Sequence, residues 1–188
     1  MTAPFAVTTE CPILIGIFNG FSWIRCEGKG SFLNSPLLKE FGAARMDAGE
    51  TCLVIDLGAC TGMDSTFMGT LAGMASRLSA TAGGVVQIAD AAERNRRSLE
   101  DLGLDFLLQI DPQDAVWLSS IDTIRADLKP PQPAAPQSLV QRTQLVLDAH
   151  RVLSEANEKN TATFSTVVSL LEVELTEKQA KEPMSTGN

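Results

Sequence analysis

Two apolar runs near the start of the chain are separated by a turn signal. Residues 13–18 and 21–26 are rich in isoleucine, phenylalanine and tryptophan, and Asn19 and Gly20 lie between them. An Asn-Gly pair between apolar runs is a strong signal for a tight β-hairpin. The sequence therefore predicts two antiparallel strands at these positions.

Helical periods and apolar runs alternate in the next part of the chain. Apolar residues recur at helical spacing over residues 32–46, with Pro36 in the first turn. Residues 51–57 and 85–89 have the pattern of strands covered on both faces. The other predicted elements are helices over residues 64–80 and 90–102 and a last strand over residues 104–110. This order predicts an α/β fold, a mixed sheet of about four to five strands with helical crossovers.

The C-terminal part of the chain has a different composition. Residues 129–137 are rich in proline and cannot hold a helix, so we expect a semi-extended linker there. It joins the domain of residues 1–128 to a helical extension over residues 138–178, which contains no glycine or proline. Residues 179–188 are expected to be a disordered tail.

The helical extension allows three arrangements. Its seven-residue frame is apolar at both ends and polar in the middle. Such a frame fits one long helix docked on the domain, a helical hairpin that breaks near residues 157–160, or a coiled coil that joins two copies as a homodimer. His150 lies on this frame, and we interpret it as a packed or solvated side chain because nothing else in the sequence completes a catalytic set.

Composition and charge narrow the function classes. The chain has 188 residues, 44% of them hydrophobic and 20% charged, which is typical of a globular protein. Its apolar runs are too short to cross a bilayer, and its first residues lack the pattern of a secretory signal, so we expect a cytoplasmic protein without membrane insertion. The formal net charge of -8 argues against nucleic acid and favours protein partners.

Candidate metal ligands and nucleophiles are sparse. Cys11, Cys26, Cys52 and Cys60 are widely spaced, and His150 is the single histidine, so reduced thiols without a bound metal or cofactor are expected. Without paired carboxylates or a nucleophile-base-orienter set, the sequence predicts no catalytic residues and no enzyme activity.

A nucleotide site is not expected either. Arg94, Arg96 and Arg97 fall on a predicted helix, where their spacing spreads them around the axis as a solvated face. The glycines after the strand over residues 51–57 do not have the spacing of a phosphate-binding loop.

The clearest chemical signal lies where that strand meets the next helix. Asp64 is a favourable helix N-cap, and it places Ser65 and Thr66 beside unpaired backbone N–H groups at the positive end of the helix dipole. In sheets with helical crossovers, ligands and partners bind at the carboxyl ends of the strands. Local sequence alone nevertheless favours a simple helix cap, because such signals are common.

Two longer stretches carry a family resemblance. VIDLGACTGMDSTFMGTL, at residues 54–71, and GGVVQIADAAERNRRSLEDLGLDFLLQI, at residues 83–110, resemble the STAS domain shared by anti-sigma factor antagonists and the cytoplasmic ends of sulfate transporters. The strands, the Asp-Ser-Thr helix start and the arginine-bearing helix occur in the family's order. The resemblance covers roughly residues 11–128 and implies a STAS-like mixed sheet.

The resemblance also implies a function. In the antagonists, the serine after the aspartate accepts phosphate from a partner that is both kinase and anti-sigma factor. Ser65 holds that position, Thr66 matches a neighbour phosphorylated in some relatives, and Asp64 supports the site as helix cap. The implied protein is a bacterial regulator of transcription that binds an anti-sigma factor or serine protein kinase and is reset by a PP2C-like phosphatase. The alternative is a non-switching STAS adaptor or assembly subunit, as in a stressosome-like particle or a lipid-transport complex.

The sequence departs from the family pattern at two places on the expected partner face. Phe67 stands where antagonists usually carry glycine, and a glycine returns at Gly69. Gly30, Ser31 and Phe32 stand where many relatives place an acidic residue. The residues expected to contact a partner are Ser31, Asn34, Met63 and Phe67.

Overall fold

The computed structural model describes residues 13–132 and 135–181. Its first two strands, β1 (Ile13–Phe18) and β2 (Phe21–Cys26), pair antiparallel from Ile13 opposite Cys26 to Phe18 opposite Phe21. Gly20, in the turn between them, has a φ of 87°, a left-handed conformation that glycine adopts without steric cost. The predicted hairpin is confirmed.

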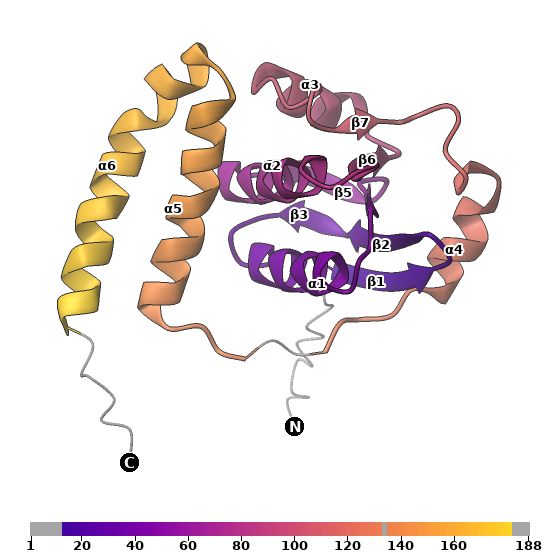
Figure 1. The fold of residues 1–188 in the computed structure, drawn as a ribbon, viewed down its shortest axis with the longest axis horizontal. Helices are drawn as coiled ribbons and strands as arrows, with labels where there is room; N and C mark the ends of the chain where they lie inside the picture. Colours follow the sequence, from indigo (N-terminus) through magenta and orange to yellow (C-terminus); the bar gives the residue numbers. More distant parts are fainter. Residues whose placement is uncertain (1–12, 133–134, 182–188) are drawn as a thin grey trace, which may run out of the picture.

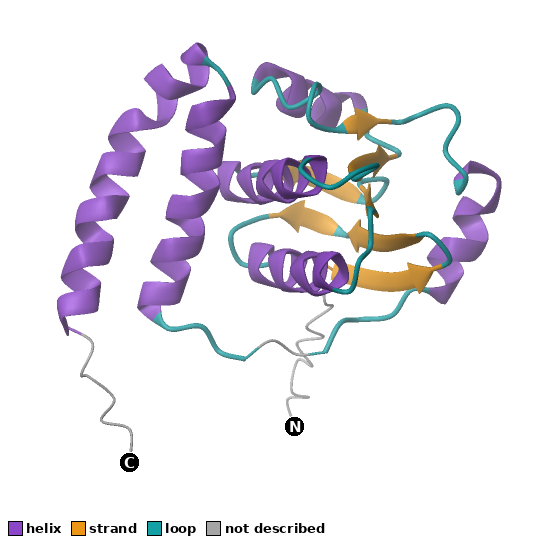
Figure 2. Cartoon of the chain, in the orientation of Figure 1, coloured by secondary structure: helices purple, strands orange, loops and turns teal. Residues whose placement is uncertain are grey.

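Strand β2 joins the hairpin to the parallel part of the sheet. It pairs with β4 (Cys52–Asp56), which pairs in turn with β6 (Val85–Ala89), and β7 (Gln109–Ile110) completes the order β1-β2-β4-β6-β7 (Figure 2). The predicted mixed sheet with helical crossovers is confirmed. The last strand is shorter than residues 104–110, because the chain turns at Leu104, whose carbonyl accepts from Leu108 N at 2.9 Å.

The crossover helices follow the predicted order with shifted starts. They are α1 (Ser35–Asp47), α2 (Ser65–Ser79) and α3 (Glu93–Asp101). Helix α1 begins later than residue 32, so Phe32 and Leu33 lie exposed before it. The sequence did not predict the short parallel pair β3 (Gly28–Gly30) and β5 (Cys60–Met63), the 3-10 turn η1 (Leu118–Ser120) or helix α4 (Ile121–Asp127).

Alternating side chains give the sheet a core on each face. Leu53 and Ile55 of β4 belong to the larger cluster with α1, α2 and α3. Val54, between them, belongs to the smaller cluster, where the rings of Trp23 and Trp117 meet edge to face with centroids 5.2 Å apart. Helix α4 covers this second face. Both faces are therefore buried, as the apolar run over β4 predicted.

Asp56, at the end of β4, is a fully buried carboxylate. It accepts bonds from Arg125 Nε and Nη2, both at 2.8 Å, from Arg25 Nη1 at 2.7 Å and from Gly58 N at 2.9 Å. Burial alone raises the pKa of Asp56, but the bonds from Arg125, Gly58 N–H and Arg25 outweigh it and hold the pKa below its usual value. This cluster fastens α4 to the sheet.

The C-terminal extension is a helical hairpin, one of the three arrangements that the sequence left open. Helices α5 (Leu139–Ala156) and α6 (Glu158–Lys181) meet at Asn157, and Figure 1 shows α5 between α6 and the rest of the domain. The carbonyl of Leu102, after α3, accepts from Asn157 Nδ2 at 3.2 Å and from Asn160 Nδ2 at 2.8 Å. These bonds fix the turn of the hairpin to the domain.

Two expectations concern the chain ends and membranes. Helix α6 continues to Lys181, past the predicted end at residue 178, and the remaining residues of the expected tail, 182–188, lie outside the described part of the chain. Among the helices that the structure describes, none combines the length and apolar character needed to span a membrane.

We predict that Asp56→Ala lowers the free energy of unfolding by about 3–5 kcal/mol at neutral pH, because it leaves Arg25 and Arg125 without their buried partner. The pKa of Asp56 is lower in the folded chain than the unfolded value of about 3.9, so its contribution is complete above that value and is lost as the pH falls through the folded pKa. Urea unfolding at pH 7 measures the loss of stability in the variant. At pH 3 the difference between the variant and the parent protein should be smaller. Asp105→Ala, at an exposed site, is the control, and an equal loss in both variants would contradict the prediction.

Candidate functional site

Asp64 caps α2 and holds the loop that follows β3. Its Oδ1 accepts from Phe67 N at 2.8 Å, which confirms the predicted N-cap. Its Oδ2 accepts from Phe32 N at 2.9 Å, and its backbone N donates to the carbonyl of Gly30 at 2.9 Å. The loop at residues 30–32 is thereby fixed beside the first turn of α2, where Ser65 lies.

Ser65 is hydrogen-bonded to His150 of α5. Its Oγ lies 3.0 Å from His150 Nε2, while His150 Nδ1 lies 2.7 Å from the carbonyl oxygen of Val146. A carbonyl only accepts, so Nδ1 carries a proton; in the neutral ring Nε2 then accepts, and the Ser65 hydroxyl donates. The ring also meets Phe164 of α6 edge to face, with centroids 5.5 Å apart. One imidazole therefore joins α2 to both helices of the hairpin.

This contact adds to the sequence interpretation. His150 is packed, as one of the two expected roles had it, and the structure adds a partner that the sequence did not indicate, because the Ser65 hydroxyl lies 3.0 Å from its ring. Catalysis would need room for a substrate at the hydroxyl. Ser65 is not among the residues that line the three cavities bordering α5.

Thr66 and Phe67, two of the predicted site residues on α2, are buried. Thr66 is 5% exposed, which disagrees with its expected role as a second phosphoacceptor. Phe67 is 0% exposed, which leaves it no surface for a partner. A Cβ added to Gly30 would lie 2.8 Å from Phe67 Cδ1, so the ring fits only because residue 30 has no side chain. The two departures from the family pattern therefore compensate for each other, because the large side chain of Phe67 fills the space that Gly30 leaves open.

The other predicted partner residues differ in role. Asn34 is buried, and its side chain accepts from Ser31 N and donates to the carbonyl of Lys29, both at 2.8 Å, so it shapes the loop. Ser31 and Met63 are partly exposed. Gly30 is paired with Met63 in the register of β3 and β5, which places Ser31 and Met63 beside the Asp64 cap. The structure therefore brings these two together with Ser65.

Gly69 is the residue that sequence reasoning missed as part of this site. A Cβ there would lie 2.4 Å from the carbonyl oxygen of Ala149, so the backbones of α2 and α5 meet at this glycine. Gly73 follows one helical turn later, where an added Cβ would make an ordinary contact, 3.8 Å from Val152 Cγ2. Two glycines four residues apart on a predicted helix are the signal that could have indicated a close helix contact.

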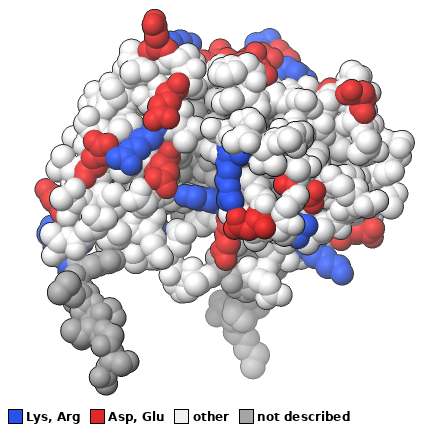
Figure 3. Space-filling model, viewed as in Figure 1, with Lys and Arg blue, Asp and Glu red and all other residues white. Residues whose placement is uncertain are grey.

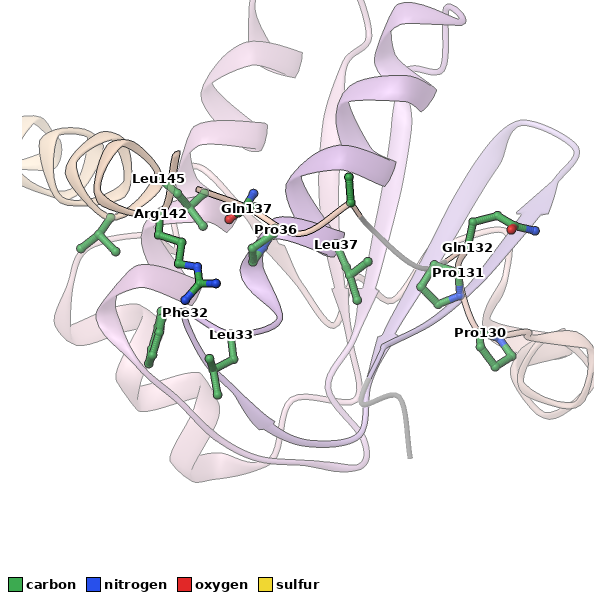
Figure 4. A pocket seen from close by; sticks show the side chains of 12 residues that line it. Phe32, Leu33, Pro36, Leu37, Pro130, Pro131, Gln132, Gln137, Arg142 and Leu145 are labelled. Carbon is green, nitrogen blue, oxygen red and sulfur yellow. The ribbon is translucent and has the colours of Figure 1, made fainter. Parts of the chain in front are cut away.

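A cavity of about 550 Å³ lies between the start of α1, the proline-rich segment and α5. Figure 4 shows the Arg142 side chain pointing toward Phe32 and Leu33, within otherwise mostly apolar walls. A ligand with an apolar body and an acidic group would match these walls, because Arg142 carries a positive charge. Helix α5 supplies Arg142 and Leu145, so the cavity exists only while the hairpin is docked.

The arginines and thiols show no gathered ligand set. Arg96 is paired with Asp111, and Arg97 with Glu93 at 2.7 Å. Within residues 13–132 and 135–181, no three histidine, cysteine, aspartate or glutamate side chains are grouped as they would be to hold a metal ion. The cysteines in these ranges are free, and Cys11 lies outside them. On the face drawn in Figure 3, acidic and basic side chains are interspersed.

Residues 14–115 match the sequence model of the STAS domain. This match covers more than half of the chain, so the protein belongs to the STAS domain family. No curated protein sequence matches it.

Two of the solved structures that resemble this chain carry the name anti-sigma factor antagonist, and a third is named a cell fate determinant. A putative antagonist from Thermotoga maritima is 18% identical, with a TM-score of 0.49 over 59% of this chain and 92% of that one. One from Mycobacterium paratuberculosis is 23% identical, with a TM-score of 0.47 over 60% and 92%. The Bacillus cell fate determinant SpoIIAA in its phosphorylated form is 17% identical, with a TM-score of 0.45 over 60% and 99%.

We predict that Asp64→Ala destabilises the protein by about 0.5–2 kcal/mol, because it removes a helix cap together with the bond to Phe32 N. Urea unfolding measures the loss, and hydrogen exchange should quicken at Phe32 and Phe67. Asp64→Asn is the matched control, since asparagine caps a helix about as well, and it should lose clearly less. An alanine variant as stable as the parent would contradict the capping role.

Proposed function

We propose that this protein is a cytoplasmic bacterial signalling protein of the anti-sigma factor antagonist type. In its unphosphorylated form it binds a serine-kinase-type anti-sigma factor or a related switch kinase. The kinase transfers a phosphoryl group from a nucleoside triphosphate to Ser65 Oγ, which loses its proton, and the partner is released. A PP2C-like phosphatase removes the group and restores binding. The protein itself acts as a binding partner and not as an enzyme.

The observation that carries this proposal is the placement of Ser65. It is the first residue of α2, directly after the capping Asp64, in a STAS domain. Its side chain is partly exposed, whereas Thr66 next to it is 5% exposed. Ser65 is therefore the phosphoacceptor that a kinase can reach with the smaller rearrangement.

Electrostatics favour a switch that leaves the fold intact. Phosphate adds about -1.5 to -2 charges at neutral pH, and a helix N-terminus stabilises an anion by about 0.3–1 kcal/mol. The nearby Asp64 carboxylate opposes it by about 1 kcal/mol in a high-dielectric setting. These effects nearly cancel within the protein. At an interface, a desolvated extra charge costs several kcal/mol, so the phosphate acts on partner binding.

We predict that Ser65→Ala and Ser65→Asp differ in partner capture. Tagged variants are used to capture partners from lysate of the native cells. Ser65→Ala should retain its kinase-type partner. Ser65→Asp should capture at least about tenfold less of that partner, because its carboxylate mimics part of the phosphate charge. Ser76→Asp places the same charge at an exposed site of the same helix and serves as the control.

Two results would count against the switch. One is equal capture by the two Ser65 variants. The other is a large change in far-UV circular dichroism in Ser65→Asp, which would mean that the charge acts on the fold and not on the interface.

A second candidate function is a non-switching STAS adaptor in a larger assembly. The outer face of α6 carries Val167, Leu170 and Val173, which are 38%, 65% and 59% exposed. Adjacent exposed aliphatic side chains on one helix favour contact with another protein surface.

We predict for this candidate that Leu170→Glu lowers the oligomeric mass of the protein in light scattering across a concentration series, because the carboxylate would be buried in the contact. Glu174→Gln, on the same helix, is the control. A parent protein that is monomeric at every concentration, or an oligomer that Leu170→Glu does not change, would argue against assembly through this face.

A further inference from the structure

We propose that the α5–α6 hairpin is a cover over the phosphoacceptor. While it is docked on α2 it restricts access to the partly exposed Ser65 hydroxyl, and Ser65 becomes more accessible when the hairpin separates from α2. This inference rests on the proposed function for its biological meaning. Its physical content, control of access to Ser65, is tested without any partner.

Helix α5 of the hairpin contacts the Ser65 hydroxyl directly. The Ser65 Oγ donates to His150 Nε2 over 3.0 Å, so the imidazole lies directly against the atom that would accept phosphate. The ring is held in turn by the Val146 carbonyl and by Phe164, so it cannot swing aside alone. A kinase must bring a phosphoryl group into line with the same oxygen, and that approach requires His150 to leave with its helix.

Helices α2 and α5 fit closely together at Gly69. Because a Cβ on Gly69 would lie 2.4 Å from the Ala149 carbonyl oxygen, α5 reaches its position only if residue 69 is glycine. Ala149 and His150 are adjacent, so the glycine contact and the serine contact form one patch. A change at Gly69 therefore acts on the cover of Ser65 without touching Ser65.

The hairpin is held by different contacts along its length. Near the turn, Leu153 and Phe164 pack against the main core, and Asn157 and Asn160 bond the Leu102 carbonyl. Farther from the turn, α5 meets α1 and α2 around a cavity of about 170 Å³ that includes Gly69 and Thr70 in its wall. Beside Gly69, part of the α5 surface therefore borders open space, although Leu145 and Ala149 of the same stretch are buried.

A surface ion pair between α1 and α5 adds little to the docking. Lys39 Nζ lies 3.0 Å from Asp148 Oδ2, and the two side chains are 50% and 40% exposed. Ion pairs at such exposure contribute little to stability because water screens them. The bonds that fix the turn are thus separate from the contact at Ser65, so α5 can open near Ser65 while the turn stays bonded.

The test uses the full chain with Ser65→Cys as a reporter of access. The rate at which a maleimide labels the introduced thiol is followed by peptide mass mapping in this variant, in Ser65→Cys with Gly69→Ala, and in Ser65→Cys with Gly73→Ala. Both added methyl groups lie on the same helix one turn apart, but only the one at residue 69 collides with α5. We expect Gly69→Ala to speed labelling at residue 65 about tenfold, and Gly73→Ala to change it less than about twofold, since the rate follows the population of the open state.

The outcomes are distinct. Equal labelling rates in the three proteins would overturn the proposal. The buried Cys26 and Cys60 report general unfolding, and they should stay unlabelled when Gly69→Ala opens the cover. If Gly69→Ala labels them too, the decision passes to His150→Ala, which removes the imidazole without crowding α2: faster labelling at residue 65 alone supports the cover, and an unchanged rate overturns it. Because no kinase is present, failure here leaves the partner-capture result unaffected, and the reverse also holds.

Discussion

The two bonds of the Asp64 carboxylate are the constraint on which the candidate site depends. One oxygen closes the first turn of α2, and the other fixes the loop at Phe32, so helix start and loop share one charged group. Ser65 is the next residue, and its hydroxyl meets His150 because the first turn is held in place. The cap that local sequence favoured therefore also positions the serine to which the family resemblance assigned the switch.

Local signals predicted what local energetics decides. The Asn19-Gly20 turn, the Asp64 cap and the apolar run over β4 each specify their element through neighbouring residues, and all three are confirmed. The short strands β3 and β5 are three or four residues long and contain glycine, so no alternation marked them. The bond between Ser65 and His150 joins residues 85 positions apart, and no local pattern indicates it. It follows from tertiary packing of the hairpin.

Two glycines explain how α2 accommodates its unusual neighbours. Gly30 leaves room for the Phe67 ring, and Gly69 leaves room for the backbone of α5. Phe67 and Gly69 thus each have a matching contact in this chain, Phe67 with Gly30 and Gly69 with Ala149. The result is a STAS domain in which most of α2 is buried and its first hydroxyl is held by a C-terminal helix. Under the proposed switch, control of the site would involve the position of the hairpin as well as the kinase.

The most direct test of the central claim is site-localised phosphopeptide analysis of the protein isolated from its native cells, with and without stress. The account predicts phosphate on Ser65, in an amount that changes with condition, and little on the buried Thr66. Persistent absence of phosphate from Ser65 across conditions would contradict the switch. In that case Asp64 and Ser65 serve as a helix cap, and the docked hairpin is a permanent part of the fold.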